Sequence, residues 1–295
     1  NNTKVAYGMI LYNVDQTVLS KIYEPITIDR QFLDEQKNDA NENTEIIMTT
    51  VFPVIILPFF MLSIILIQMI GAEVNDEKTT RSMEIIISNV SPETHLASKI
   101  AAGNLFVICQ TLLLVAYFVL GLVIRKVTGG FDVSNNVTGY VMGMLESLNG
   151  GQFLSKLIYI IPFVIILLLV TFLAYSLLAG ILASMTTNIE DFQQLQTPMM
   201  VTSLAGYYLA MLAGVFKGSI FIRILSYVPL ISAILSPSLL VLGEVGIIDV
   251  VIAILVCIIF VYALIKYGIK IYKVGILNYS SKDLWKKMFK AVKEK

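Results

Sequence analysis

The 295-residue sequence is poor in charged residues, and it holds one histidine, one tryptophan and two cysteines. Charged residues make up 14% of the chain, against about 25% in soluble domains. Hydrophobic residues make up 57%, and the mean hydropathy is +0.80. This composition excludes an ordinary soluble domain and indicates an integral membrane protein.

Several catalytic and nucleotide-binding motifs are also missing. No Gly-x-x-x-x-Gly-Lys-Ser/Thr occurs, so the chain cannot hold a nucleotide by the P-loop route. The single histidine, His95, has no partner for a His-Glu-x-x-His zinc site, and we expect it on the surface or at a contact. Cys109 and Cys257 lie in apolar runs without metal-ligand spacing. We therefore expect no catalytic residue, no metal and no bound cofactor, and an energy source outside this chain.

Five apolar runs are long enough to cross about 30 Å of hydrocarbon. They cover residues 46–70, 100–124, 157–185, 198–216 and 247–267. Residues 218–246 are apolar too, but they are broken into pieces of about ten residues, which favours a re-entrant helical pair over a sixth span. The interrupting residues are Arg223, Pro229, Pro237 and Glu244. The sequence thus predicts an all-α integral membrane protein with about five transmembrane helices and a re-entrant pair.

Charge predicts how the parts of the chain are placed. Residues 46–270 form the expected transmembrane domain, and residues 1–45, with four basic and eight acidic side chains, form a partial extracellular region. Nine of the 21 basic residues lie in residues 266–295, which predicts that the tail 271–295, and with it the C-terminus, is cytoplasmic. Five spans then put both the insert 71–99 and a polar turn at 186–197 inside. A sixth span would move the insert outside.

The insert 71–99 is the longest charged segment between two apolar runs. Glu73, Glu77 and Arg81 follow an i, i+4, i+8 spacing, which predicts that the first span continues as a helix in which Glu77 pairs with Arg81. Ser91 followed by a proline is typical of a helix N-cap with proline at the first helical position. The pattern fits either a contact surface for a partner or a charged hairpin on the lipid headgroups.

The insert resembles the coupling segment of ABC type-2 permeases, in the subgroup that includes sodium-efflux permeases. The matching residues are Glu73, Asp76, Glu77, Lys78, Arg81, the run 83–88, Ser91, Pro92 and Lys99. Residues 227–230 with Ser236 and Pro237 are similar to the re-entrant extracellular element of that family, and residues 272–277 are similar to the motif after its last span.

This resemblance implies that the chain is the permease subunit of an ATP-driven exporter. It also implies a location in the cell membrane, which we expect to be a bacterial plasma membrane. The partners it implies are a cytoplasmic ABC ATPase that binds ATP and Mg, a second permease half and membrane lipid, without nucleic acid. The family has six spans and an extracellular domain after the first, so we expect this sequence to lack that first span. An alternative is a membrane scaffold or sensor whose insert binds another partner.

The resemblance also implies two sets of site residues. The ATPase contact would comprise Glu77, Arg81, Met83, Glu84, Ile85, Ile86, Ile87, Ser88, Ser91 and Pro92. The re-entrant extracellular element would comprise Arg223, Pro229 and Pro237.

Overall fold

The computed structural model describes residues 52–128, 152–216 and 218–279. Every regular element in these ranges is a helix. The predicted all-α class is therefore confirmed, and it follows from the composition because a helix satisfies its backbone hydrogen bonds internally in hydrocarbon. The predicted extracellular region 1–45 lies outside the described residues, as does most of the predicted tail 271–295.

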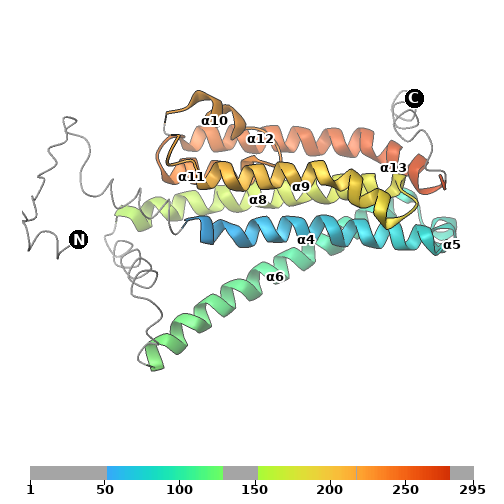
Figure 1. The fold of residues 1–295 in the computed structure, drawn as a ribbon, viewed down its shortest axis with the longest axis horizontal. Helices are drawn as coiled ribbons and strands as arrows, with labels where there is room; N and C mark the ends of the chain where they lie inside the picture. The colour runs from blue at the N-terminus through green and yellow to red at the C-terminus, as the bar shows by residue number, and fades with distance from the viewer. Residues whose placement is uncertain (1–51, 129–151, 217, 280–295) are drawn as a thin grey trace, which may run out of the picture. The chain divides into compact units, whose positions relative to one another are not determined.

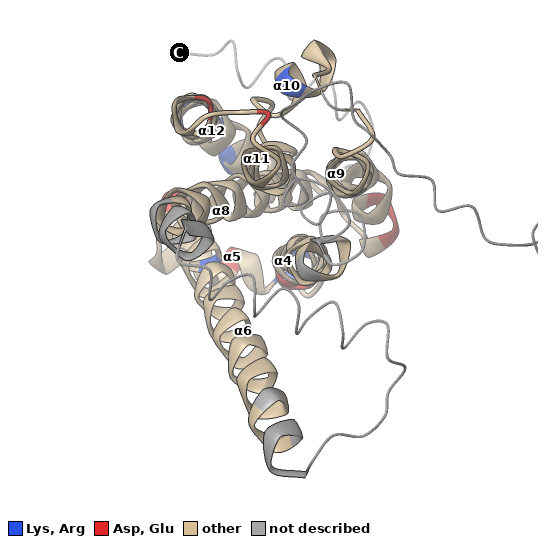
Figure 2. Ribbon diagram, turned by 90° about the vertical axis from the view of Figure 1, so that its left-hand side faces the viewer, with Lys and Arg blue, Asp and Glu red and all other residues tan. Residues whose placement is uncertain are grey.

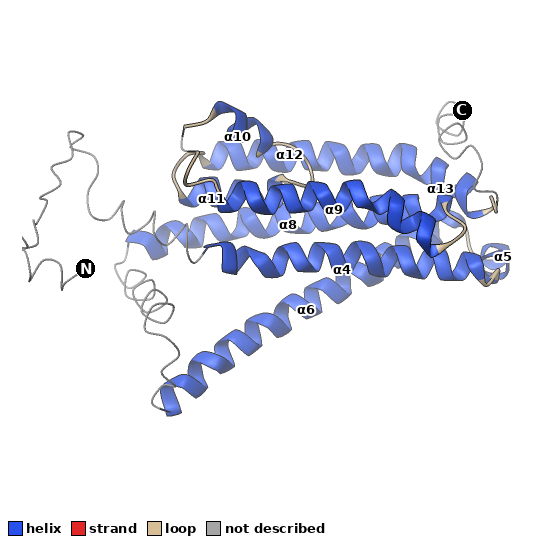
Figure 3. Ribbon diagram, viewed as in Figure 1, coloured by secondary structure: helices blue, strands red, loops and turns tan. Residues whose placement is uncertain are grey.

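Five long helices form a bundle in the described part of the chain (Figures 1 and 3). They are α4 (Phe52–Thr79), α6 (Pro92–Thr128), α8 (Gln152–Met185), α9 (Ile189–Met211) and α12 (Ile247–Ala263). α12 continues through a π-helical turn, η1 (Leu264–Gly268), into α13 (Ile269–Ile276). Three short helices complete the set: α5 (Ser82–Asn89), α10 (Ile220–Leu225) and α11 (Ser232–Val241).

Successive long helices run in alternating directions (Figure 1). α5 and α13 lie at one end of the bundle, which we call the α5 end. α9 finishes and α12 begins at the other, which we call the α10 end because α10 lies there. The short helices α10 and α11 occupy the chain between α9 and α12, so neither adds a pass along the bundle.

Buried apolar side chains form two clusters. Leu66, Met83 and Tyr272 belong to the first, which joins α4, α5 and α13 near the α5 end. Leu235 and Ile254 belong to the second, near the α10 end, where almost all of α11 is buried. α11 also packs on α9. At Gly206 of α9, a Cβ atom would lie 3.4 Å from the Cα atom of Ile231, which is an ordinary van der Waals distance.

α6 leaves the bundle after its first turns (Figure 2). Its buried positions are His95, Leu96, Ile100, Gly103 and Val107, which lie on one helical stripe against α4, α8 and α13. Beyond Val107 its described side chains are apolar and exposed, with the half-buried Gln110 and Thr111 as exceptions. Within the described chain, the second half of α6 has no covering helix, and its apolar side chains are of the kind that face lipid.

Four described helical stretches are long and apolar enough to cross a membrane. They are Ile56–Thr79, Pro92–Gly121, Ile160–Met185 and Ile247–Ile276. These overlap four of the five predicted runs. The fifth run, 198–216, overlaps α9, which is long enough but more polar.

α9 also begins earlier than the sequence predicts. The expected polar turn at 186–197 is wrong, because only residues 186–188 separate α8 from α9. Glu190 and Asp191 lie in the first turn of α9, where carboxylates stabilise the positive end of the helix dipole. Pro198 therefore sits inside a helix rather than at its start.

Candidate functional site

α5 is a separate helix joined to α4 by a sharp turn. α4 ends at Thr79, and Arg81 has a left-handed backbone conformation with φ of 58°. This conformation is uncommon for residues other than glycine, and here it redirects the chain before α5 starts. The Ser82 hydroxyl donates to the Glu77 carbonyl at 3.1 Å and so satisfies one of the last carbonyls of α4. The predicted helical pair of Glu77 with Arg81 is wrong, because the helix ends between them.

The predicted contact residues of α5 divide into a buried and an exposed group. Met83 is fully buried in the core, and it holds α5 against the bundle. Ile86 and Ile87 are half-buried. Glu84, Ile85 and Ser88 are exposed, with Ile85 70% exposed. We call these three residues, together with the exposed Ser91, the α5 surface.

The start of α6 matches the prediction from sequence. α6 begins at Pro92, which is half-buried, and the Thr94 N–H donates to the Ser91 hydroxyl at 3.2 Å. Ser91 is thus a side-chain N-cap, and proline at the first helical position loses no helical hydrogen bond.

Carboxylates of α4 face basic side chains of α6 beneath α5. The Lys99 ammonium lies 2.7 Å from the Glu77 carboxylate and 3.1 Å from that of Glu73. His95, one turn earlier on α6, has Nε2 2.9 Å from Glu77 and Nδ1 2.7 Å from the Tyr272 hydroxyl. We call Glu73, Glu77, His95, Lys99 and Tyr272 the charged cluster. The His95–Glu77 contact lacks hydrogen-bond geometry, so its attraction rests on charge when the imidazole is protonated.

The placement of His95 differs from the prediction. We expected a surface or contact residue, but the side chain is buried between α4, α6 and α13. The i, i+4 spacing of His95 with Lys99 matches that of Glu73 with Glu77, and these two matched pairs are the signal in the sequence that the prediction missed. The partner Tyr272 is 177 residues away, and no local pattern indicates it.

Lys78 lies on the last turn of α4 and is 1% exposed. Its ammonium donates to the Ser184 carbonyl at 2.5 Å and to the Gly275 carbonyl at 2.8 Å. These carbonyls belong to the last turns of α8 and α13, where the helix dipole is negative and a cation is favoured. A side chain on Gly275 would come within 2.5 Å of the Ser184 hydroxyl, so glycine is needed for this approach. Lys78 therefore ties three helix ends together.

The chain after α13 also contacts this end of the bundle. Partial burial and a hydrogen bond with the Glu84 carboxylate raise the pKa of Tyr279. The Lys78 ammonium lies 5.9 Å from the centre of the Tyr279 ring, within the range of a cation–π contact. On the surface, Lys273 of α13 pairs with Glu93 of α6 at 2.6 Å. The α5 surface is thus contacted by the chain after α13, and α5 itself packs on α4.

A second polar group lies at the α10 end. The Arg223 guanidinium on α10 contacts both oxygens of Asp249 on α12, at 2.9 and 3.0 Å. The Tyr227 hydroxyl donates to Asp249 at 2.5 Å, and the Gly246 N–H donates to it at 2.8 Å. The hydrogen bond with Asp249 and partial burial raise the pKa of Tyr227. We call Arg223, Tyr227 and Asp249 the α10 clasp.

The other two predicted residues of this element are prolines. Pro229 lies in the turn between α10 and α11, before Leu230, whose φ is 78°. Pro237 lies inside α11. The structure thus brings Arg223 together with Asp249, a partner that the sequence reading missed because it placed Asp249 within the last apolar run. The signal was a lone carboxylate three residues after Gly246, a spacing typical of a helix start.

The described residues hold no group of three or more His, Cys, Asp or Glu side chains that could bind a metal ion. The charged cluster and Lys78 instead join helices, and their chemistry is that of ion pairs and hydrogen bonds in a partly buried setting. Together they join α4, α6, α8 and α13 at the α5 end.

Comparison with known proteins identifies the class. A model of the ABC-2 family transporter proteins matches residues 1–266. The chain therefore belongs to the ABC-2 transporter family, as the resemblance of its insert predicted.

The chain is also similar to the uncharacterized protein YhaP of Bacillus subtilis (strain 168), with 28% identity over 298 residues. The match covers 99% of this chain and 65% of that relative, so the chain spans just under two thirds of its length. No solved structure matches the chain.

Proposed function

We propose that this chain is a membrane permease subunit of an ATP-driven ABC exporter, and that a separate cytoplasmic ATPase docks on the α5 surface. Membership of the ABC-2 transporter family supports the transport role. In this proposal ATP and Mg bind to the partner, because the sequence contains no P-loop. A second permease half completes the transport path, and the α5 end and the C-terminus are cytoplasmic, as the basic tail favours.

The observation that carries the proposal is the combination of exposure and support at α5. Ile85 and Glu84 are exposed at the tip of the bundle, where an apolar side chain beside a carboxylate suits a protein contact. Directly beneath them, Met83 is buried in the core and Glu77 pairs across to α6. A push on α5 would therefore reach α4 and α6 as rigid elements, and rigid-body movement is a common form of switching.

The test is to co-express the full-length protein with a candidate cytoplasmic ABC ATPase from the same organism. Ile85→Asp places a carboxylate on the α5 surface and is expected to weaken co-purification of the ATPase at least about tenfold, a loss of about 1.4 kcal/mol. Stimulation of ATP hydrolysis by the permease should fall with it. Leu277→Asp is the matched control, because Leu277 is 61% exposed at the same end but lies outside the α5 surface.

Two results would contradict the proposal. Equal ATPase binding by the Ile85→Asp and Leu277→Asp variants would rule out docking on α5. An ATPase that binds while no solute moves, in vesicles supplied with ATP and a panel of ions and amphipathic compounds, would favour the scaffold or sensor role.

A further inference from the structure

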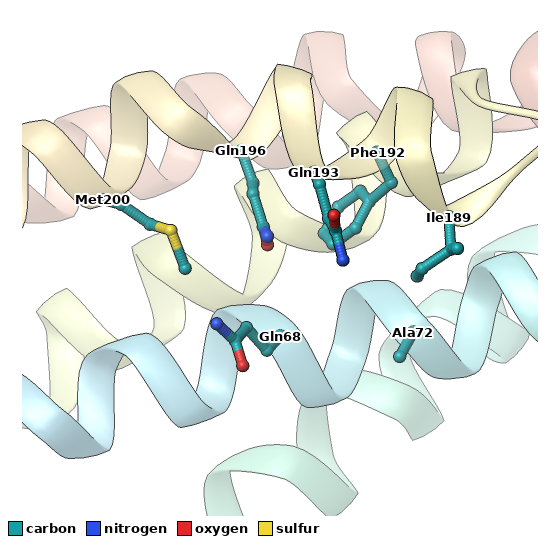
Figure 4. Close-up of a pocket in the computed structure, with 7 residues that line it drawn as sticks. All are labelled: Gln68, Ala72, Ile189, Phe192, Gln193, Gln196 and Met200. Atoms are coloured by element: carbon teal, nitrogen blue, oxygen red, sulfur yellow. The ribbon is translucent and has the colours of Figure 1, made fainter.

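A pocket of about 450 Å³ opens between α4 and α9 (Figure 4). Gln68 and Ala72 line it from α4, and Gln193, Gln196 and Met200 line it from α9. Figure 4 shows the Gln193 and Gln196 side chains extending from α9 toward α4, with Gln68 lying along α4. The volume is within the range of sites for small molecules.

Gln196 is the residue that marks this pocket as a site. Its side chain is 5% exposed, and its amide oxygen has no hydrogen-bond partner among the described residues. Buried polar atoms are nearly always paired, and an unpaired one costs free energy. The Gln196 oxygen has almost no accessible surface of its own, although the residue lines the pocket. A turn of the amide toward the pocket would let a donor carried by a bound molecule satisfy it.

The floor of the pocket is apolar and rigid. The ring of Phe192 packs on Gly71, where a side chain would come within 1.8 Å of the ring. Phe192 is itself 1% exposed. Met200, at the other end of the pocket, adds a flexible apolar side chain that adapts to different shapes. A ligand would thus meet amides from both helices, with Phe192 and Met200 of α9 as its apolar contacts.

None of the residues lining the pocket is charged. An amide side chain both donates and accepts hydrogen bonds, whereas a site for a hard cation needs several oxygen ligands and usually carboxylates among them. A charged solute would lose its hydration here without a countercharge. The lining suits an uncharged molecule that has N–H or O–H donors and an apolar part.

We propose that this pocket binds the transported solute, and that the solute belongs to the class of uncharged amphipathic molecules with hydrogen-bond donors. The inference rests on the proposed function, because transport is what a ligand site within the bundle would serve. α4 carries both Gln68 at the pocket and Lys78 at the α5 end. A single helix thus connects ligand contact with the surface proposed to receive the ATPase.

The test uses dansylamide, an uncharged fluorescent sulfonamide with N–H donors, and its N,N-dimethyl analogue, which has none. Binding is measured by fluorescence with the full-length permease and its ATPase in lipid nanodiscs. Gln196→Leu removes the unpaired acceptor and keeps the side-chain size. We expect it to weaken dansylamide binding five- to tenfold. Gln194→Leu, on an exposed position of the same helix outside the pocket, should leave binding unchanged.

The dimethyl analogue should bind wild type more weakly than dansylamide does, and Gln196→Leu should not change its affinity. The proposal is overturned if Gln196→Leu binds dansylamide like wild type, or if the two probes bind wild type equally. Displacement of dansylamide by sodium chloride, but not by choline chloride, would identify a cation site and would also overturn it.

The probe measurement and the ATPase docking test fail independently. If the two probes show the expected selectivity but Ile85→Asp binds the ATPase as well as Leu277→Asp does, the pocket proposal stands and docking on α5 is rejected. Normal docking with no probe selectivity would reject the pocket alone.

Discussion

The two ends of the bundle secure their short helices by different means. At the α5 end, Lys78 is buried and bonded to the last turns of α8 and α13, while His95 is buried between Glu77 and Tyr272. At the α10 end, the Arg223 side chain of the α10 clasp is 54% exposed. Removing one partner of a buried charged network is costly, whereas an exposed ion pair contributes little and is screened by salt.

This difference indicates which end moves as a unit. The charges of the α5 end are satisfied only when α4, α6, α8 and α13 keep their relative positions, so these helix ends should shift together. The α10 clasp links α10 to the start of α12 through groups that water can solvate when they separate. In the proposed transport role, we therefore expect the α10 end to open at lower cost than the α5 end.

The largest effect is expected from Lys78→Met. The substitution removes two charge-assisted hydrogen bonds. The Ser184 carbonyl loses this donor, and the Gly275 carbonyl keeps only the Asn278 N–H at 3.0 Å, so the protein should be destabilised by about 3 kcal/mol. Unfolding of the detergent-solubilised protein, followed by circular dichroism, measures this loss. Lys273→Met is the matched control, since the Lys273–Glu93 pair is exposed and should contribute at most about 1 kcal/mol. Equal losses in both variants would remove the proposed contrast between buried and exposed charges.

A smaller effect is expected from His95→Ala. The Tyr272 hydroxyl loses its partner and Glu77 keeps only Lys99, so the loss should be about 1–2 kcal/mol. A double-mutant cycle with Tyr272→Phe should give a coupling energy of about 0.5 kcal/mol or more, because the two side chains are in contact. Strict additivity of the two single losses would show that the 2.7 Å contact between His95 and Tyr272 adds no stability.

The smallest effect is expected from Arg223→Gln in the α10 clasp. Its unfolding midpoint should fall less than that of either α5-end variant, and the difference from wild type should shrink between low and high salt because exposed charges are screened. The measurement is the midpoint at both salt concentrations. A shift as large as that of Lys78→Met, unaffected by salt, would mean that the clasp is as tightly built as the α5 end.

Much of the fold could be predicted from the sequence, but less of the site. Apolar runs indicated α4, α6, α8 and α12, because long hydrophobic segments have one stable solution in a bilayer. Ser91 with Pro92 located the start of α6, since capping is a local interaction. α9 was placed too late, because Pro198 suggested a helix start more strongly than the carboxylates of its true first turn.

The contacts of the charged residues could not be read in this way. Lys78 meets carbonyls 106 and 197 residues away in the chain, and a single sequence has no local pattern for such pairings. The general expectation that lysine and histidine are exposed also led away from the buried Lys78 and His95. For Arg81 a local pattern was present but misleading. Its spacing from Glu73 and Glu77 predicted a continuous helix, but α4 ends at Thr79 and Arg81 has a left-handed backbone conformation.

The π turn η1 determines where α13 aims its side chains. An α-helix rotates about 100° per residue, and a π turn takes in an extra residue without completing an extra turn. Everything after Gly268 is therefore rotated by about 100° relative to a continuous α-helix. With one residue fewer in that turn, Tyr272 would be directed about a quarter of a circle away from His95, and Gly275 would no longer face Ser184. The rotation that η1 introduces thus determines which side chains of α13 face His95 and Ser184.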